Sequence, residues 1–265
     1  MNKNTKSLFL TGVATLALTS LLANASGEKG NGTDILHLSL RATMSATGIE
    51  PSAAGKVMAT QNEQGKANNQ KLNLTFSGLA ANTTYELLAG INGNTNFTDV
   101  TPFTTDVDGN AALNYRSLGN GNGHGHGGGL GHGVGPLPSA LNPLSQVQDF
   151  TVFNSSTQAV LSVDLTTPDQ LSYLIKRKLS NGDVNGSLRL KATTTQTQFR
   201  LTALGLQATN DYLLAFNGGV VQTNTADADG KLVITSAPTP TNILDLSSVA
   251  LWDSSSNVVL STTLP

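Results

Sequence analysis

The chain contains no cysteine, few charges and few aromatic residues. Without cysteine, no disulfide can hold the fold together, and a lipid anchor that needs a cysteine at the cleavage point is excluded. Charged residues make up 12% of the chain, against about 25% in a typical globular protein. Beyond the first 25 residues no apolar run is long enough to span a membrane, so we expect no transmembrane anchor in the mature chain.

The low charge also bears on the partner. The formal net charge is −2, and it becomes −4 once a leader that carries Lys3 and Lys6 is removed. Counterion release by clustered positive charge drives binding to nucleic acids. A mildly acidic chain with few charges lacks that driving force, and we therefore expect no nucleic-acid partner.

The N-terminus has the three parts of a secretory signal. Lys3 and Lys6 precede an apolar run over residues 8–22, and small residues follow at Ala23 and Ala25. We expect residues 1–25 to be a signal peptide and residues 26–33 a flexible N-terminal segment. The mature protein is then secreted, either to the periplasm or outside the cell.

Two blocks of the mature chain resemble each other. The residues that recur in the same order are Gly78, Tyr85, Asp106, Asp108 and Gly109 in the first block, and Gly205, Tyr212, Asp227, Asp229 and Gly230 in the second. The spacing differs between the blocks only in loop-like sequence. We therefore expect two tandem repeats, at 34–166 and 167–265, with a Gly/His-rich insert at 119–138 in the first.

Short apolar or β-branched runs bounded by Gly, Asn, Asp and Pro predict the secondary structure. In the first repeat they cover 72–76, 85–91, 110–115, 147–153 and 158–165, and in the second 199–204, 212–217, 231–235, 246–252 and 257–264. No segment after the leader has a helical stripe. The fold class expected is all-β, with each repeat an antiparallel β-sandwich. The short boundary at 165–168 favours a restrained pair of modules.

The segments 77–85 and 204–212 each place a Gly-Leu pair six or seven residues before a tyrosine. This block resembles the Gly-Leu-x-Pro-x-Thr-x-Tyr corner of fibronectin type III and related Ig-like modules. The resemblance implies two tandem Ig-like sandwiches, in which the tyrosine hydroxyl bonds back to the chain and the leucine fills the core. Modules of this kind are mostly spacers and binding surfaces, and this analogy carries no specific function.

The Asp-x-Asp-Gly elements at 106–109 and 227–230 have two interpretations. Alternating acidic residues suggest calcium ligands, but Gly follows the second Asp at once and no acidic residue closes the loop. The alternative is a hairpin turn in which Asp bonds its own backbone and Gly takes a positive φ. We favour the turn.

The insert holds three of the four histidines, at His124, His126 and His132. Imidazoles on a glycine-rich chain could bind zinc, copper or nickel, although the loop would have to lose conformational freedom to do so. The remaining histidine, His37, lies in a strand-like segment, and we expect its side chain on the solvent-facing side. We expect no cofactor.

Two aromatic residues occupy matching positions near the ends of the repeats, Phe153 and Trp252. They could form exposed platforms for a sugar, or they could be buried or partly buried at the ends of apolar strands, which we favour. The chain has no Gly-x-Ser-x-Gly, His-Glu-x-x-His or cysteine nucleophile, and we expect no enzyme activity. The favoured function is a structural or interaction protein with a cell-surface protein or polysaccharide as partner; the alternatives are a carbohydrate- or surface-binding module and metal binding through the insert.

Overall fold

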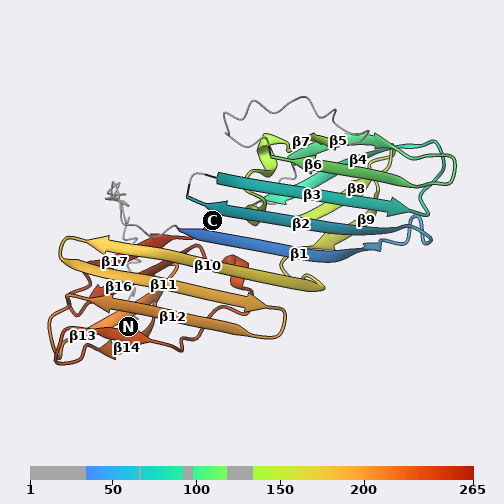
Figure 1. Cartoon of the computed structure of the whole chain (residues 1–265). Coiled ribbons are helices and arrows are strands. Elements are labelled where there is room, and N and C mark those ends of the chain that lie inside the picture. Colours follow the sequence, from blue (N-terminus) through green and yellow to red (C-terminus); the bar gives the residue numbers. More distant parts are fainter. Residues whose placement is uncertain (1–33, 66, 92–97, 118–133) are drawn as a thin grey trace, which may run out of the picture.

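The computed structural model describes residues 34–65, 67–91, 98–117 and 134–265, and this part of the chain is all-β (Figure 1). Its only helical turns are the short 3-10 segments η1 (Ser139–Leu141), η2 (Leu144–Gln146) and η3 (Ile243–Asp245). The expected signal peptide at 1–25 and the segment 26–33 lie outside the described residues. So do His124, His126 and His132.

The first half folds into two layers. One layer has the strand order β1-β2-β3-β6-β7, formed by β1 (Ile35–Ala46), β2 (Ala54–Gln64), β3 (Ala67–Ser77), β6 (Ala111–Arg116) and β7 (Val134–Pro136). The second has the order β5-β4-β8-β9, formed by β4 (Thr84–Ile91), β5 (Thr98–Thr104), β8 (Val147–Phe153) and β9 (Ala159–Asp164). Only β7 is parallel to its neighbour, β6. The end of β1 also pairs with β9, which joins the two layers.

The second half has a similar pair of layers. One has the order β10-β11-β12-β15, formed by β10 (Gln170–Asn181), β11 (Val184–Thr193), β12 (Thr197–Leu204) and β15 (Leu232–Ile234). The other has the order β14-β13-β16-β17, formed by β13 (Asp211–Phe216), β14 (Gly219–Thr225), β16 (Ser248–Asp253) and β17 (Val258–Thr263).

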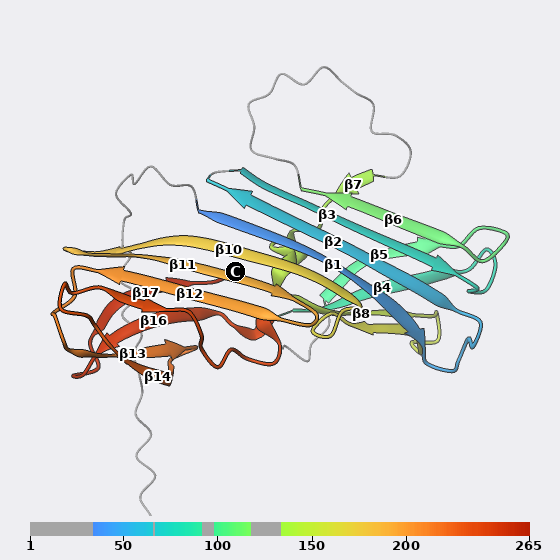
Figure 2. The same ribbon diagram turned by 60° about the horizontal axis from the view of Figure 1, so that its bottom comes forward.

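The halves are joined by antiparallel pairing of β1 with β10, so their first layers form one main sheet (Figures 1 and 2). The register places Leu38 opposite Tyr173, and both side chains are buried. Residues opposite each other in a sheet share a face. Both second layers therefore cover the same face of the main sheet, and its other face is continuous across the molecule.

Alternation in the sequence produces this arrangement. In β1 the even-numbered residues from Leu36 to Met44 are buried, and in β11 Leu188, Leu190 and Ala192 are buried. Successive side chains of a strand point to opposite faces, so the residues between them point away from the core. The main sheet thus has an apolar inner face and a polar outer face.

A strand lies at each of the ten segments that the sequence predicted. The prediction was incomplete, however, because it marked β1 only as a strand-like segment around His37 and omitted β2, β10 and β11, and also β5, β7 and β14. The first four of these build the centre of the main sheet.

Candidate functional site: the outer face of the main sheet

Positive charge collects on the outer face of the main sheet. Nine Lys and Arg residues of the described main-sheet strands lie on this face: Arg41, Lys56, Lys71, Arg116, Lys176, Lys178, Arg189, Lys191 and Arg200. Of the others in the described part of the chain, Arg177 lies in phase with the inner face of β10, and Lys231 precedes β15. The main-sheet strands, as far as the structure describes them, hold a single acidic residue, Glu63, and it alternates in phase with the buried residues of β2. The outer face is therefore basic.

Three of these cations form a line across neighbouring strands. Lys176 of β10 lies directly opposite Arg189 of β11, and Arg189 lies directly opposite Arg200 of β12. All three side chains are exposed. Lys178 and Lys191 lie two residues along the strands on the same face. We call Lys176, Arg189 and Arg200 the basic row, and the row together with Lys178 and Lys191 the basic patch.

The basic row is unfavourable for the isolated protein. Like charges directly opposite each other in a sheet are destabilising. Within the described residues, ion pairs are found only at Arg177, whose guanidinium lies 3.9 Å from both Asp34 and Glu63. No carboxylate there pairs with the basic row. This arrangement lowers the stability of the fold and concentrates positive charge at the solvent-facing surface.

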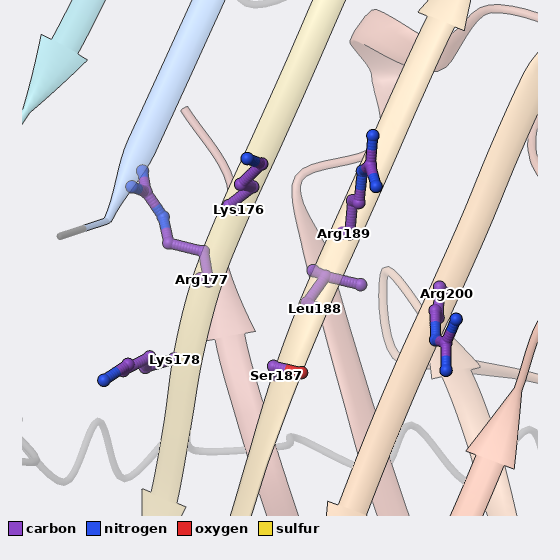
Figure 3. A pocket seen from close by; sticks show the side chains of 7 residues that line it. All are labelled: Lys176, Arg177, Lys178, Ser187, Leu188, Arg189 and Arg200. Atoms are coloured by element: carbon purple, nitrogen blue, oxygen red, sulfur yellow. The ribbon is translucent and has the colours of Figure 1, made fainter. Parts of the chain in front are cut away.

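A hollow of about 400 Å³ lies over the row (Figure 3). It is lined from β10 by Lys176, Arg177 and Lys178, from β11 by Ser187, Leu188 and Arg189, and from β12 by Arg200. In Figure 3 the side chain of Arg177 turns toward the start of β1, in keeping with its ion pairs. The hollow offers cations and a hydroxyl, a set suited to an oxyanion.

The opposite side of the first half carries acidic groups. Glu86, Asp149 and Asp164 alternate with the buried residues of β4, β8 and β9, so they face away from the main sheet. Asp149 lies opposite Asp164. Burial raises the pKa of Asp149, and the charge of Asp164 raises it further. A hydrogen bond from the Gly90 N–H acts in the opposite direction and lowers this pKa. Charge is thus separated between the two sides of the molecule.

The two tyrosines of the corner motif make the same hydrogen bond. The Tyr85 hydroxyl accepts the Ala80 N–H at 2.9 Å, and the Tyr212 hydroxyl accepts the Gln207 N–H at 2.9 Å. Tyr85 also donates to the Glu50 carboxylate. Gly78 and Gly205, at the start of each motif, have φ values of 67° and 80°, and a Cβ there would lie 2.2 and 2.6 Å from a backbone oxygen.

The Asp-x-Asp-Gly elements are turns stabilised by their first aspartate. Asp106 Oδ1 accepts the N–H groups of Asp108 and Asn110, and the equivalent bonds reach Asp227 from Asp229 and Lys231. Gly109 and Gly230 have φ values of 75° and 69°. The expectation of a hairpin was wrong, because β5 pairs with β4 whereas β6 pairs with β3. The first turn therefore connects the two layers.

Phe153 and Trp252 are both half-buried on strands β8 and β16. Each strand has a β-bulge at this position. The indole Nε1 of Trp252 is buried and lacks a hydrogen-bond partner among the described residues. Neither ring therefore forms an exposed platform on which a sugar could stack. The two residues also lie in different layers, so the fold does not bring them together.

Other observations concern metals, membranes and known proteins. In the described ranges, no group of three or more His, Cys, Asp or Glu side chains could hold a metal ion. The same part of the chain includes no helix with the length and apolar character needed to cross a bilayer. Comparison with protein-family models, with curated proteins and with solved structures finds no match. The site must be interpreted from its own chemistry.

Sequence reasoning did not find the basic patch. A signal was present at 188–192, where Arg189 and Lys191 alternate with apolar residues. Alternation of this kind predicts strands with one charged face. The pairing of β10 with β11 and of β11 with β12 was needed to bring these charges together with Lys176, Lys178 and Arg200.

Proposed function

We propose that this chain is an exported, non-catalytic interaction protein that works through the outer face of its main sheet. Export is supported by the basic start, the apolar run and the small residues at 23 and 25. The observation that carries the interaction role is the basic row. A protein without an anionic partner gains nothing from three cations held side by side at a cost in stability.

We further propose that the two halves are tandem copies of one Ig-like sandwich. The support is the recurrence of single features: the tyrosine corner, the Asp-Gly turn, and a glycine on the second strand of each half, Gly55 and Gly186. A Cβ at Gly55 would meet Met44, and a Cβ at Gly186 would meet the Thr202 carbonyl oxygen and Leu260. Aligned through these features, Leu38 corresponds to Tyr173.

This correspondence gives the junction an unusual symmetry. Leu38 is paired with Tyr173, its own counterpart, in the β1–β10 ladder. An interface in which each element meets its own equivalent has the form of a two-fold dimer contact. The proposed copies thus meet as two identical subunits would, and their outer faces merge into one long surface.

Fractionation of the native producing cells tests the proposed function. The protein should be retained on washed envelope or extracellular matrix, and high salt or a competing polyanion should release it, because the interaction is electrostatic. Recovery of all the protein as free monomer in the medium or periplasm would contradict an interaction role.

A further inference from the structure

We propose that the basic patch binds an acidic polysaccharide, with the sugar chain lying across β10, β11 and β12. This inference rests on the proposed function and names the partner class for the same face. The polymer's carboxylate or sulfate groups would be held by Lys176, Arg189 and Arg200. The outer-face hydroxyls and amides of neighbouring residues would meet its hydroxyl groups.

The register of the strands supports an extended ligand. Lys176, Arg189 and Arg200 are directly opposite one another on three consecutive strands, which lie about 4.8 Å apart. Lys178 and Lys191 extend the positive charge along the strands from this row. A regular line of cations fits a polymer with repeated negative charge better than a compact small molecule.

The first half provides an internal comparison. By the proposed alignment, the row corresponds to Arg41, Met58 and Asn73, which also lie directly opposite one another on β1, β2 and β3. These three positions therefore hold one cation in the first half and three in the second. The additional arginines are not required by the fold, which leaves a ligand as the reason for them.

The chemistry around the row favours a polysaccharide over other polyanions. Apart from Leu174 and the lysines of the basic patch, the outer-face neighbours of the row are polar: Ser187, Gln198 and Thr202. Such side chains can exchange hydrogen bonds with sugar hydroxyls. No Phe, Tyr or Trp alternates onto the outer face in the described main-sheet strands, so a stacking platform for single-stranded bases is missing there.

An anionic membrane fits this face less well. Peripheral membrane surfaces combine cations with apolar side chains that enter the bilayer. On the outer faces of β10, β11 and β12 the apolar residues are Leu174 and Leu204, and they are separated by polar positions. The face therefore lacks a continuous apolar area to insert.

Binding of the full mature chain to polygalacturonate tests the proposal, with dextran as the uncharged control and short duplex DNA as a second polyanion. The test variant is Arg189→Met with Arg200→Asn, which introduces the residues of the first half at the same places. We expect about a tenfold loss of affinity for polygalacturonate, as befits two exposed charge contacts. The dependence of log affinity on log salt should become shallower by about two.

Two further variants make the result specific. Met58→Arg with Asn73→Arg creates a second row and should raise the affinity. Lys231→Met removes a cation that lies outside the main-sheet strands and outside the basic patch, and it should leave the affinity unchanged. Circular dichroism and thermal unfolding would verify that every variant folds.

The remaining outcomes overturn the proposal. These are binding to duplex DNA but not to polygalacturonate, equal binding to dextran, no binding to either polyanion, or an equal loss in Lys231→Met. The variants also separate this inference from the proposed function. The variant Arg189→Met/Arg200→Asn can also be followed in native cells. If the envelope retains it to the same extent as the unaltered protein, the interaction role stands and the polysaccharide site at the row is wrong.

Discussion

The hydroxyl groups of Tyr85 and Tyr212 close a loop of the same size in each half. Each accepts the N–H of the residue five positions earlier, and both rings are buried. Phenylalanine would keep the ring but remove this bond. The Gln207 N–H would then lose the Tyr212 hydroxyl, and the Ala80 N–H would keep only its bond to the Glu50 carboxylate. The hydroxyl is therefore the part of each tyrosine that fixes the entry to β4 and β13.

We expect Tyr212→Phe and Tyr85→Phe each to lower the free energy of unfolding by about 1–2 kcal/mol, the cost of a lost hydrogen bond with a partly buried partner. Chemical denaturation measures the change. Tyr173→Phe is the matched control, because this tyrosine is also buried but its hydroxyl has no hydrogen-bond partner among the described residues. Equal losses in all three variants would contradict a specific role for the corner bonds.

Asp106 and Asp253 make the stability of their turns sensitive to acid. The Asn110 N–H lowers the pKa of Asp106, with further help from the Asp108 N–H. The Asn257 side chain and N–H lower the pKa of Asp253. A carboxyl group whose pKa is lowered by folding stabilises the fold above its unfolded pKa of about 3.9, and this contribution disappears as the pH falls through the folded pKa.

We therefore expect the carboxyl resonances of Asp106 and Asp253 to titrate below the value for a free aspartate, as measured by NMR. Asp106→Asn should abolish its share of the acid dependence of stability, because asparagine keeps an acceptor oxygen but cannot lose a charge. A titration of Asp106 at or above the ordinary aspartate pKa would show that the two N–H bonds are not formed in solution.

At the scale of elements, the turns between layers depend on glycine. A Cβ on Gly109 would lie 2.1 Å from the Leu79 carbonyl oxygen, and a Cβ on Gly230 would lie 2.2 Å from that of Leu206. Both glycines also have positive φ. The turn and the corner motif therefore pack backbone to backbone, which explains why both recur together in the sequence.

Gly109→Ala and Gly230→Ala should each destabilise the protein by clearly more than the roughly 1–2 kcal/mol that a left-handed conformation costs a residue with a side chain. Gly182→Ala separates the two causes, because Gly182 has a φ of 60° but no atom lies within 4 Å of its Cβ position. Thermal unfolding compares the three variants. If Gly182→Ala is as harmful as the others, the close backbone contact has no measurable effect.

Whether a strand could be predicted from the sequence depended on its local pattern of residues. Strands that are short, apolar and bounded by turn residues, such as β4 and β8, could be predicted. β2 and β11 were missed because small and polar residues dilute their alternation, and β10 because three cations stand next to each other at 176–178. For Phe153 and Trp252 the sequence correctly favoured partial burial over exposed platforms.

The basic patch shows what a single sequence cannot supply. Lys176 and Arg200 are 24 positions apart, and only the registers of two successive strand pairs place them in one row. Strand registers depend on pairing between distant segments, which local alternation does not specify. The corner tyrosines were identifiable because their hydrogen bonds span only five residues.

For the whole molecule, net charge is a poor description of the surface. The formal charge of −2 sums a basic outer face and acidic groups placed on turns and on the second layers. Net charge averages over both faces of the molecule. It therefore does not exclude a polyanion from binding to the basic face. Long-range attraction follows the local field, which here has opposite signs on the two sides of the molecule.

The continuous outer face of the main sheet depends on the pairing of β1 with β10, since this junction joins the outer faces of the two halves. The lack of native cysteine allows a direct test with the double variant Ser39→Cys/Ser172→Cys. These residues are directly opposite in the register, and paired antiparallel residues have Cα separations within the range that a disulfide bridges. Thr43→Cys/Ser172→Cys is the control, with one partner four residues out of register.

Mild oxidation followed by mass spectrometry of the monomer is the decisive measurement. Pairing of β1 with β10 predicts a nearly complete internal disulfide between positions 39 and 172, with unchanged circular dichroism, and little or none between 43 and 172. Absence of the first disulfide, or equal formation of both, would mean that the two halves do not share one sheet.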